Sequence, residues 1–239
     1  VERKRQQGVA LTTLGLGRGN YNDQLMEQLA DVGNGHYAYI DTLNEARKVL
    51  VEELASTLEI IAQDVKVQIE FNPAVVAEYR LIGYENRQLK REDFENDRVD
   101  AGEIGAGHTV TALYELALVG SSAQRLKPLR YQSASNPTQR ADELALLRLR
   151  YKAPQSEHSQ LLEFVLKTEE IIHSMAATSA DFRFAAAVAA FGQLLRQNKY
   201  LESFTYEDVR ALAQPALGAD PFGYRHEFME LVRLAEDLQ

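Results

Sequence analysis

The hydrophobic pattern of the first sixty residues predicts strands and helices in alternation. Residues 9–16 form an almost unbroken apolar and β-branched run, as in a buried parallel strand. A helix capped by Asn22 or Asp23 should follow and end at residues 33–35, and its apolar stripe would carry Leu25, Leu29 and Val32. Residues 36–40 predict a second strand. Asp41 or Thr42 then caps another helix, whose expected inner face consists of Leu43, Ala46, Leu50, Leu54 and Leu58.

From Asp64 the period of the pattern changes to two. Val65, Val67, Ile69 and Phe71 alternate with polar residues, which predicts a half-exposed antiparallel strand with one face in a core. Further strands are expected over residues 78–84, 109–119, 144–152 and 161–167. Five or more such strands suggest a β-sandwich. A polar connection rich in Ser and Pro, between Gly120 and Glu143, interrupts them.

After Ile172 the strand signals stop and three helices are expected. An Ala-rich helix carries the stripe Phe184, Val188, Phe191 and Leu195. Thr205 and Asp208 have capping-box spacing, and Asp220 followed by Pro221 predicts the start of the last helix. The expected fold is therefore a partial Rossmann-like α/β domain, an antiparallel β-sandwich and a helical subdomain, over residues 1–62, 63–172 and 173–239.

Composition narrows the functional classes. Lys plus Arg is 26 and Asp plus Glu is 35, which gives a net charge of −9 and argues against nucleic acid as a partner. Cys is absent, which excludes disulfides and thiolate chemistry within these 239 residues. The longest apolar run, residues 184–191, is far shorter than the roughly 20 residues that span a bilayer. Since the sequence opens at Val1 within a charged segment, we expect it to be part of a longer protein.

Gly15, Gly17 and Gly19 follow a strand and precede a helix, so they suggest a nucleotide-binding turn. The dinucleotide fingerprint needs a further glycine where Asn20 stands, although Asp41 lies roughly where its acidic residue would be. We therefore favour a tight structural turn, and keep a nucleotide-binding enzyme as the rival hypothesis.

An acidic run contains Asp93, Glu95, Asp97, Asp100 and Glu103. The first three have the spacing of a calcium loop. That loop needs glycine at its sixth position and a bidentate acid at its twelfth, where this sequence has Arg98 and Ile104. A solvated acidic loop is the favoured interpretation.

The histidines show no metal-ligand spacing. They are His36, His108, His158, His173 and His226, and no two are closer than 15 residues. His108 follows Gly105 and Gly107 at a strand start and is expected to be packed or hydrogen-bonded. Neither a Gly-x-Ser-x-Gly elbow nor a Walker loop occurs. No catalytic, cofactor-binding or metal-binding residue is assigned.

Residues 8–50, which include the pair Leu29 and Ala30, resemble the C-terminal half of a von Willebrand factor type A domain. Residues 71–87, 100–116 and 220–232 look like the region that follows this domain in a group of bacterial proteins of uncharacterised function. In the resembled family, an Asp-x-Ser-x-Ser loop with a Thr and an Asp holds Mg²⁺ or another divalent cation that binds a protein ligand. This sequence has no such loop, so the resemblance places the cation site before Val1.

The resemblance implies a non-catalytic, adhesion-type module that binds an unknown protein ligand. It also implies an extracytoplasmic or cell-envelope location. Two alternatives stay open, a nucleotide-binding enzyme that uses residues 15–19 and a structural scaffold with exposed strand edges.

Overall fold

The computed structural model describes residues 1, 10–17, 21–53, 59–83, 88–99, 101–127, 140–197, 199–201 and 203–238. The chain forms two compact units built from interleaved segments. The first contains Val1–Ile69, Leu89–Val110 and Leu147–Phe164. The second contains Glu70–Gln88, Thr111–Leu146 and Val165–Gln239.

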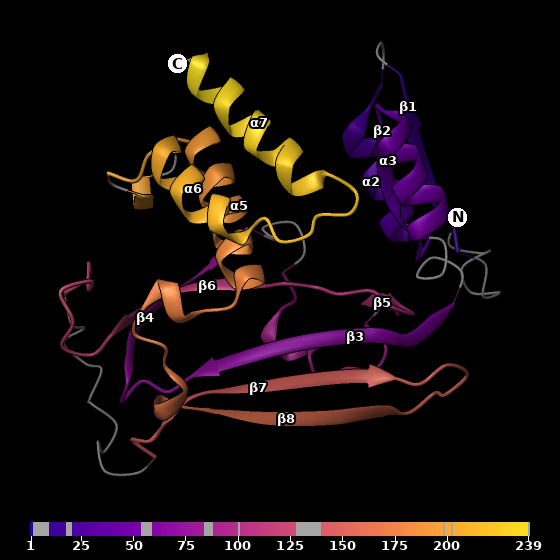
Figure 1. Cartoon of the computed structure of the whole chain (residues 1–239). Coiled ribbons are helices and arrows are strands. Elements are labelled where there is room, and N and C mark those ends of the chain that lie inside the picture. The colour runs from indigo at the N-terminus through magenta and orange to yellow at the C-terminus, as the bar shows by residue number, and fades with distance from the viewer. Residues whose placement is uncertain are drawn as a thin grey trace. The chain divides into compact units, whose positions relative to one another are not determined.

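The first unit opens with two short parallel strands, each followed by a helix (Figure 1). The four elements are β1 (Thr13–Leu16), α2 (Asp23–Val32), β2 (Tyr37–Ile40) and α3 (Leu43–Arg47). Thr13 lies opposite Tyr37 in the pairing of β1 with β2. The predicted order of strand, helix, strand and helix is confirmed.

Side-chain caps begin both helices, as the sequence predicts. The Oδ1 of Asn22 accepts a hydrogen bond from the N–H of Leu25 at 3.0 Å, before α2. Thr42 Oγ1 accepts one from the N–H of Glu45 at 3.1 Å, before α3. Each cap satisfies a backbone donor that has no partner within its helix.

The helix after Thr42 differs from the expected single amphipathic helix. After five residues it becomes a π-helix, η1 (Lys48–Glu52), in which the N–H of Glu53 bonds to the carbonyl of Lys48. The wider π turn breaks the 3.6-residue period, so leucines seven positions apart no longer share a face. Leu43 is 89% exposed and Leu50 is also exposed, so the predicted inner face is wrong there. Leu54 and Leu58 lie outside the described residues.

A four-stranded sheet has the order β5-β3-β7-β8. Its strands are β3 (Ile60–Phe71), β5 (Gly102–Gly105), β7 (Glu143–Lys152) and β8 (Ser159–Lys167). β3 and β5 are antiparallel, and β3 and β7 run in opposite directions in Figure 1. Asp64, with φ of +49°, sits at a bulge in the pairing of β3 with β5.

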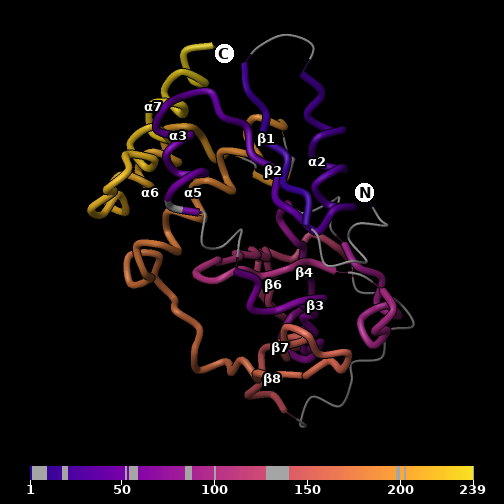
Figure 2. Tube along the Cα trace, turned by 90° about the vertical axis from the view of Figure 1, so that its right-hand side faces the viewer, coloured from indigo at the N-terminus to yellow at the C-terminus, as the bar shows by residue number. Residues whose placement is uncertain are grey.

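The second unit contains an antiparallel pair of strands and three helices (Figure 2). These are β4 (Val76–Ile82), β6 (Leu113–Leu118), α5 (Ala180–Leu195), α6 (Tyr206–Ala213) and α7 (Tyr224–Asp237). The helical core consists of Ala187, Ala190, Tyr206, Val209, Ala213 and Val232. Small side chains on α5 let α6 approach closely, which gives the Ala-rich run a packing role.

The capping box predicted at Thr205 and Asp208 is present. The N–H of Thr205 donates to Asp208 Oδ2 at 2.8 Å, and the N–H of Asp208 donates to Thr205 Oγ1 at 3.3 Å. Two backbone donors at the start of α6 are thereby satisfied reciprocally.

The last helix begins at Tyr224, three residues after the predicted start at Pro221. Gly223 precedes it with φ of +77°, a left-handed conformation that favours glycine. The Asp220 carboxylate still accepts bonds from the first-turn N–H groups, those of Arg225 at 3.2 Å and His226 at 3.0 Å. Asp220 therefore caps the helix from a greater distance along the chain than expected.

Strand bounds also move, although the antiparallel strands themselves are confirmed. β3 starts at Ile60, and β6 is shorter than the expected residues 109–119. β5 is absent from the prediction because two of its four residues are glycine, which has low strand propensity. The arrangement of these strands as a sandwich, and the boundaries at residues 62 and 172, stay predictions. The polar connection lies largely outside the described residues.

Short helical turns complete the chain. They are η2 (Arg91–Asp93), η3 (Thr168–Glu170), η4 (Met175–Ala177), η5 (Lys199–Leu201) and η6 (Gln214–Ala216).

Candidate functional site

The glycine turn after β1 is packed against an aromatic ring. A Cβ atom added to Gly15 would lie 2.2 Å from Tyr21 Oη and 2.3 Å from Tyr21 Cε2, so this ring covers the Gly15 backbone. Gly17 has φ of +79°, which explains glycine there on conformational grounds. Gly19 and Asn20 lie outside the described residues. The covered backbone at Gly15 supports the structural interpretation of the turn over the nucleotide one.

Three tyrosines and one aspartate form a cluster beside this turn. Tyr21 donates to Tyr37 Oη at 2.5 Å, and Tyr37 donates in turn to the carboxylate of Asp23. Tyr39 donates to the Gly17 carbonyl at 2.9 Å, and its ring centroid is 5.1 Å from that of Tyr21. The bond to Asp23, the bond with Tyr21 and burial raise the pKa of Tyr37. Its hydroxyl therefore stays protonated at neutral pH and fixes the turn.

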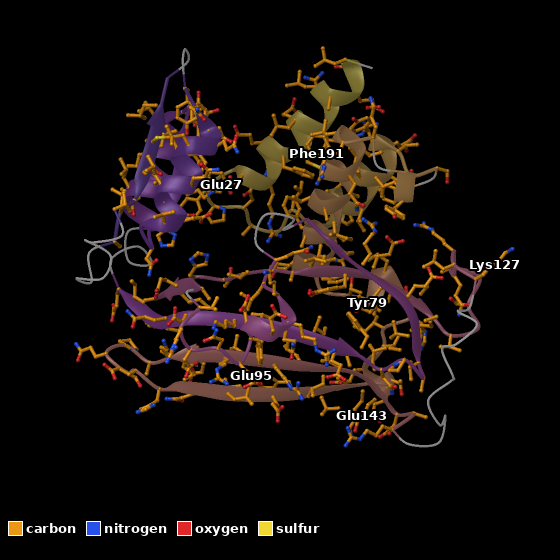
Figure 3. The ribbon with its side chains drawn as sticks, turned by 180° about the vertical axis from the view of Figure 1, so that it is seen from behind. Glu27, Tyr79, Glu95, Lys127, Glu143 and Phe191 are labelled. Atoms are coloured by element: carbon orange, nitrogen blue, oxygen red, sulfur yellow. The ribbon has the colours of Figure 1, made fainter. Side chains whose placement is uncertain are left out.

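The acidic loop, residues 91–99, is held by basic side chains of the four-stranded sheet. Arg150 on β7 donates to Glu95 Oε2 at 2.8 Å, and to Asp97 Oδ1 from Nε at 3.2 Å and from Nη2 at 3.1 Å. Figure 3 shows Glu95 beside the strands of this sheet. Glu95 and Asp97 are exposed, as expected for a solvated acidic loop, but their carboxylates also pair with Arg150.

Two lysines and one apolar side chain extend this attachment. Lys66, which is 3% exposed, donates to the Asp93 carbonyl at 3.2 Å and to the Asn96 carbonyl at 2.5 Å. Lys152 donates to the Asp97 carbonyl at 3.0 Å and forms an ion pair with Asp64 at 2.5 Å. Phe94, in the middle of the loop, is buried. We call Lys66, Arg150, Lys152 and the groups they hold the loop clasp.

Ser159 and the clasp together lower the pKa of Asp97. A hydrogen bond from Ser159, together with the Arg150 guanidinium and the nearby Lys152, holds the pKa of the Asp97 carboxyl below its usual range. Asp97 is therefore charged at neutral pH and serves as an anchor for the loop. Asp100 lies outside the described residues, and Asn34 Nδ2 donates to Glu103 Oε1 at 2.9 Å. The run thus has a structural role that its calcium-like spacing did not indicate.

The structure brings two of the five histidines together. The ring centroids of His36 and His108 are 5.8 Å apart, a contact that sequence spacing does not reveal. His226 Nδ1 lies 2.6 Å from Asp220 Oδ2. His158 and His173 are exposed. His108 itself is exposed and lies between β5 and β6, so the expectation of a packed residue at a strand start is wrong.

In the residues that the structure describes, no group of three or more His, Cys, Asp or Glu side chains is arranged to hold a metal ion. Over the same ranges, every helix is too short or too polar to cross a bilayer.

A cleft in the second unit is the candidate functional site. It lies between the β4–β6 pair and α5, and its volume is about 260 Å³. Ala186 and Ala189 on α5 leave the space open, and the β4–β6 wall carries Ile82 and Leu113. Further lining residues are Tyr114, Met175, Phe182, Ala190, Tyr200, Leu201, Phe204 and Leu212. The cleft is thus mainly apolar.

One charged network lies at the polar end of the cleft. Arg80 Nε donates to Glu115 Oε2 at 3.1 Å, and Arg80 Nη2 donates to Gln193 Oε1 at 3.0 Å. The Arg80 guanidinium carbon lies 4.2 Å from the ring centroid of Tyr200. Arg125 forms a second, longer pair with Glu115 at 3.6 Å. Because Arg80 is neutralised by a carboxylate, the cleft suits an uncharged apolar group better than an anion.

Tyr114 borders the cleft, but its ring lies on the other face of the β4–β6 pair, 5.4 Å from the ring centroid of Phe71. Burial, and to a smaller extent the nearby Tyr79, raises the pKa of its phenol. The hydroxyl is therefore protonated at neutral pH. Sequence reasoning missed this whole site, because its residues come from segments more than 100 positions apart.

Comparisons with known proteins place most of the chain in one family. The family described as "Uncharacterized protein YfbK, C-terminal" matches residues 56–238. The "Uncharacterized protein YfbK" of Escherichia coli (strain K12) is 51% identical over 239 residues, which are 99% of this chain and 40% of the relative. The chain thus spans about two fifths of that relative's length.

One solved structure was also matched. The "Crystal structure of the ArnB paralog VWA2 from Sulfolobus acidocaldarius" aligns with 94% of this chain and 51% of that one, at 16% identity and a TM-score of 0.35.

Proposed function

This chain belongs to the YfbK C-terminal family, and within that family we propose that it is a non-catalytic protein-interaction module. The cleft between the β4–β6 pair and α5 carries the proposal. Its expected occupant is an apolar side chain of a protein partner. This agrees with the protein-binding role that the resemblance to A-domains implies.

The size and charge of the cleft support a side chain as occupant. Small-molecule sites commonly occupy about 300–1,000 Å³. The cleft, at about 260 Å³, is below that range, and its one arginine is already paired with Glu115. A pocket of this kind is typical of the places where a single apolar anchor dominates a protein interface.

Filling the cleft tests the proposal. Peptides that bind the wild-type protein would be selected from a displayed library, and their affinity measured by calorimetry. Ala186→Leu and Ala189→Leu each add a side chain that occupies the open space. Either change is expected to weaken peptides with a Leu, Met or Phe anchor at least tenfold, by excluding that anchor.

A matched control lies on the same helix. Val188 is exposed and is not part of the cleft wall, so Val188→Leu should leave peptide affinity within twofold of wild type. If the cleft-filled variants keep their helical content and bind the peptides as tightly as wild type, the peptides bind outside the cleft. Selection that yields no apolar-anchored peptide would contradict the proposal itself.

Cation-dependent adhesion is a separate part of the proposal. This chain lacks the Asp-x-Ser-x-Ser loop, so its residues do not supply the A-domain ligand set. EDTA is therefore expected to leave peptide binding to the cleft unchanged, and to reduce only ligand capture that uses a cation site outside these residues. A loss of cleft binding in EDTA would contradict this separation.

We also propose an extracytoplasmic or cell-envelope location, which the resemblance implies. Fractionation of cells that carry a tag on the complete polypeptide tests it. Recovery of the tag with periplasmic or membrane markers is expected, and recovery with cytoplasmic markers would contradict it.

A further inference from the structure

In most sheets the apolar face is covered and the polar face is exposed, and in the four-stranded sheet of this chain the two are reversed. Arg148 bonds to Gln68 at 3.3 Å and to Glu163 at 3.0 Å, so these polar side chains of β7, β3 and β8 share one face. Because side chains alternate along a strand, the intervening residues occupy the other face. Tyr151 and Gln160, bonded at 3.1 Å, belong to that second face.

The second face is apolar, and it is partly open to solvent, most of all at Val67, Leu162 and Phe164. We call it the apolar face, and it consists of Val65, Val67, Ile69, Leu147, Leu149, Tyr151, Leu162 and Phe164. Val67 is 58% exposed and Phe164 is 51% exposed, and every other member is at least partly exposed. The expectation that the alternating apolar residues of β3 face a core is therefore wrong at Val67, whereas Phe71, at the end of β3, packs against Tyr79 and Tyr114.

The polar face is the covered one over β3 and β7. The acidic loop lies on it, and Lys66 is almost fully buried there, between Val65 and Val67 in sequence. The clasp therefore fixes which way the sheet faces, because reversing it would expose Phe94 and break the bonds of Arg150. The apolar face is left for another part of a larger structure to cover.

Size argues against a second copy of the chain as the cover. Five residues on each of three strands span roughly 250 Å², from the strand spacing and the rise per residue. A stable interface between separate proteins buries about 800 Å² on each partner. A layer that belongs to the same polypeptide avoids the entropy cost of association, so a small apolar contact is sufficient.

We propose that a second antiparallel sheet, contributed by the remainder of the same polypeptide, packs on the apolar face and completes a two-layer sandwich. The curated relative has three fifths of its length outside the match, enough to supply several strands. The face carries no charged side chain, as expected for a buried sheet-to-sheet contact. This inference does not depend on the cleft or on the proposed binding function.

Cysteine labelling on adjacent residues of β8 tests the inference in the complete polypeptide that the gene encodes. Leu162→Cys lies on the apolar face, and Leu161→Cys lies on the opposite face with similar exposure, 40% against 45%. Maleimide labelling, read by mass spectrometry of the labelled peptide, is expected to be at least tenfold slower at position 162. Both positions should react equally in urea.

Further variants guard against local unfolding. Phe164→Cys and Val67→Cys lie on the same face, and both should be protected like position 162. Equal labelling of positions 161 and 162 in the folded polypeptide would overturn the inference. Protection that appears only at high protein concentration, with a doubled molecular mass, would assign the cover to a second copy and also overturn it.

Discussion

Arg150 donates two hydrogen bonds to one oxygen of Asp97, from Nε at 3.2 Å and from Nη2 at 3.1 Å. The Arg150 side chain is only 18% exposed, so the pair is partly shielded from water. Arg150→Met should lower the free energy of unfolding by about 1.5–3 kcal/mol, the range for hydrogen bonds to charged groups. Urea unfolding followed by circular dichroism measures this.

A surface pair provides the control for that prediction. Arg233 on α7 bonds to Glu230 and Asp237, but its side chain is 54% exposed. Arg233→Met should therefore change the unfolding free energy by less than about 0.5 kcal/mol. Equal effects at the two arginines would mean that the clasp adds no more stability than an exposed pair.

The depressed pKa of Asp97 makes the clasp sensitive to acid. A carboxyl whose pKa is lower in the folded state stabilises the fold above its unfolded pKa, about 3.9, and loses that contribution as pH falls through the folded value. The stability difference between wild type and Asp97→Asn should be constant near neutrality and shrink below about pH 4.

Ser159→Ala isolates the hydrogen bond that lowers this pKa most. The pKa of Asp97, followed by NMR of its carboxyl carbon, should rise toward the ordinary value in that variant. An unchanged pKa would show that Arg150 and Lys152 alone determine it.

Replacement by alanine is expected to destabilise the protein at Gly15 but not at Gly102. At Gly15 the new Cβ would occupy the position of the Tyr21 ring and break its bond to Tyr37, at a cost of about 1–2 kcal/mol. At Gly102 no heavy atom lies within 4 Å of the new Cβ, so Gly102→Ala should be neutral or slightly stabilising. Thermal unfolding and near-ultraviolet circular dichroism of the tyrosines measure both.

Val232 in α7 is fully buried in the helical core. Val232→Ala removes two methyl groups and leaves a cavity, so the free energy of unfolding should fall by about 2 kcal/mol. Val188→Ala, at an exposed position of α5, should change it by less than about 0.5 kcal/mol. Similar losses at both positions would contradict this description of the core.

Local signals predicted the elements well, because their causes lie within a few residues. Thr42 and Thr205 satisfy backbone donors three positions ahead, and alternation over residues 65–71 requires only a strand. Periodicity identifies two faces but does not decide which one is covered. The acidic loop covers the face that carries Lys66, so Lys66 is buried and Val67, on the other face, is exposed.

Both the cleft and the clasp depend on pairs that are distant in sequence. Arg80 meets Gln193 across 113 positions, and Lys152 meets Asp64 across 88. A pattern of neighbouring residues cannot reveal either pairing. From the sequence, the basic residues of β7 were therefore predicted only to form the polar face of a strand. The π-helix at Lys48 was likewise unforeseen, because its sequence has an ordinary amphipathic pattern.

The long interval between β3 and β7 has a consequence for synthesis. A ribosome releases Lys66 and Val67 well before it translates Arg150 and Lys152, so the nascent strand waits with both its backbone edge and its valines unprotected. Such a segment is an aggregation hazard during translation, and is expected to be a binding site for chaperones until the second half of the sheet emerges.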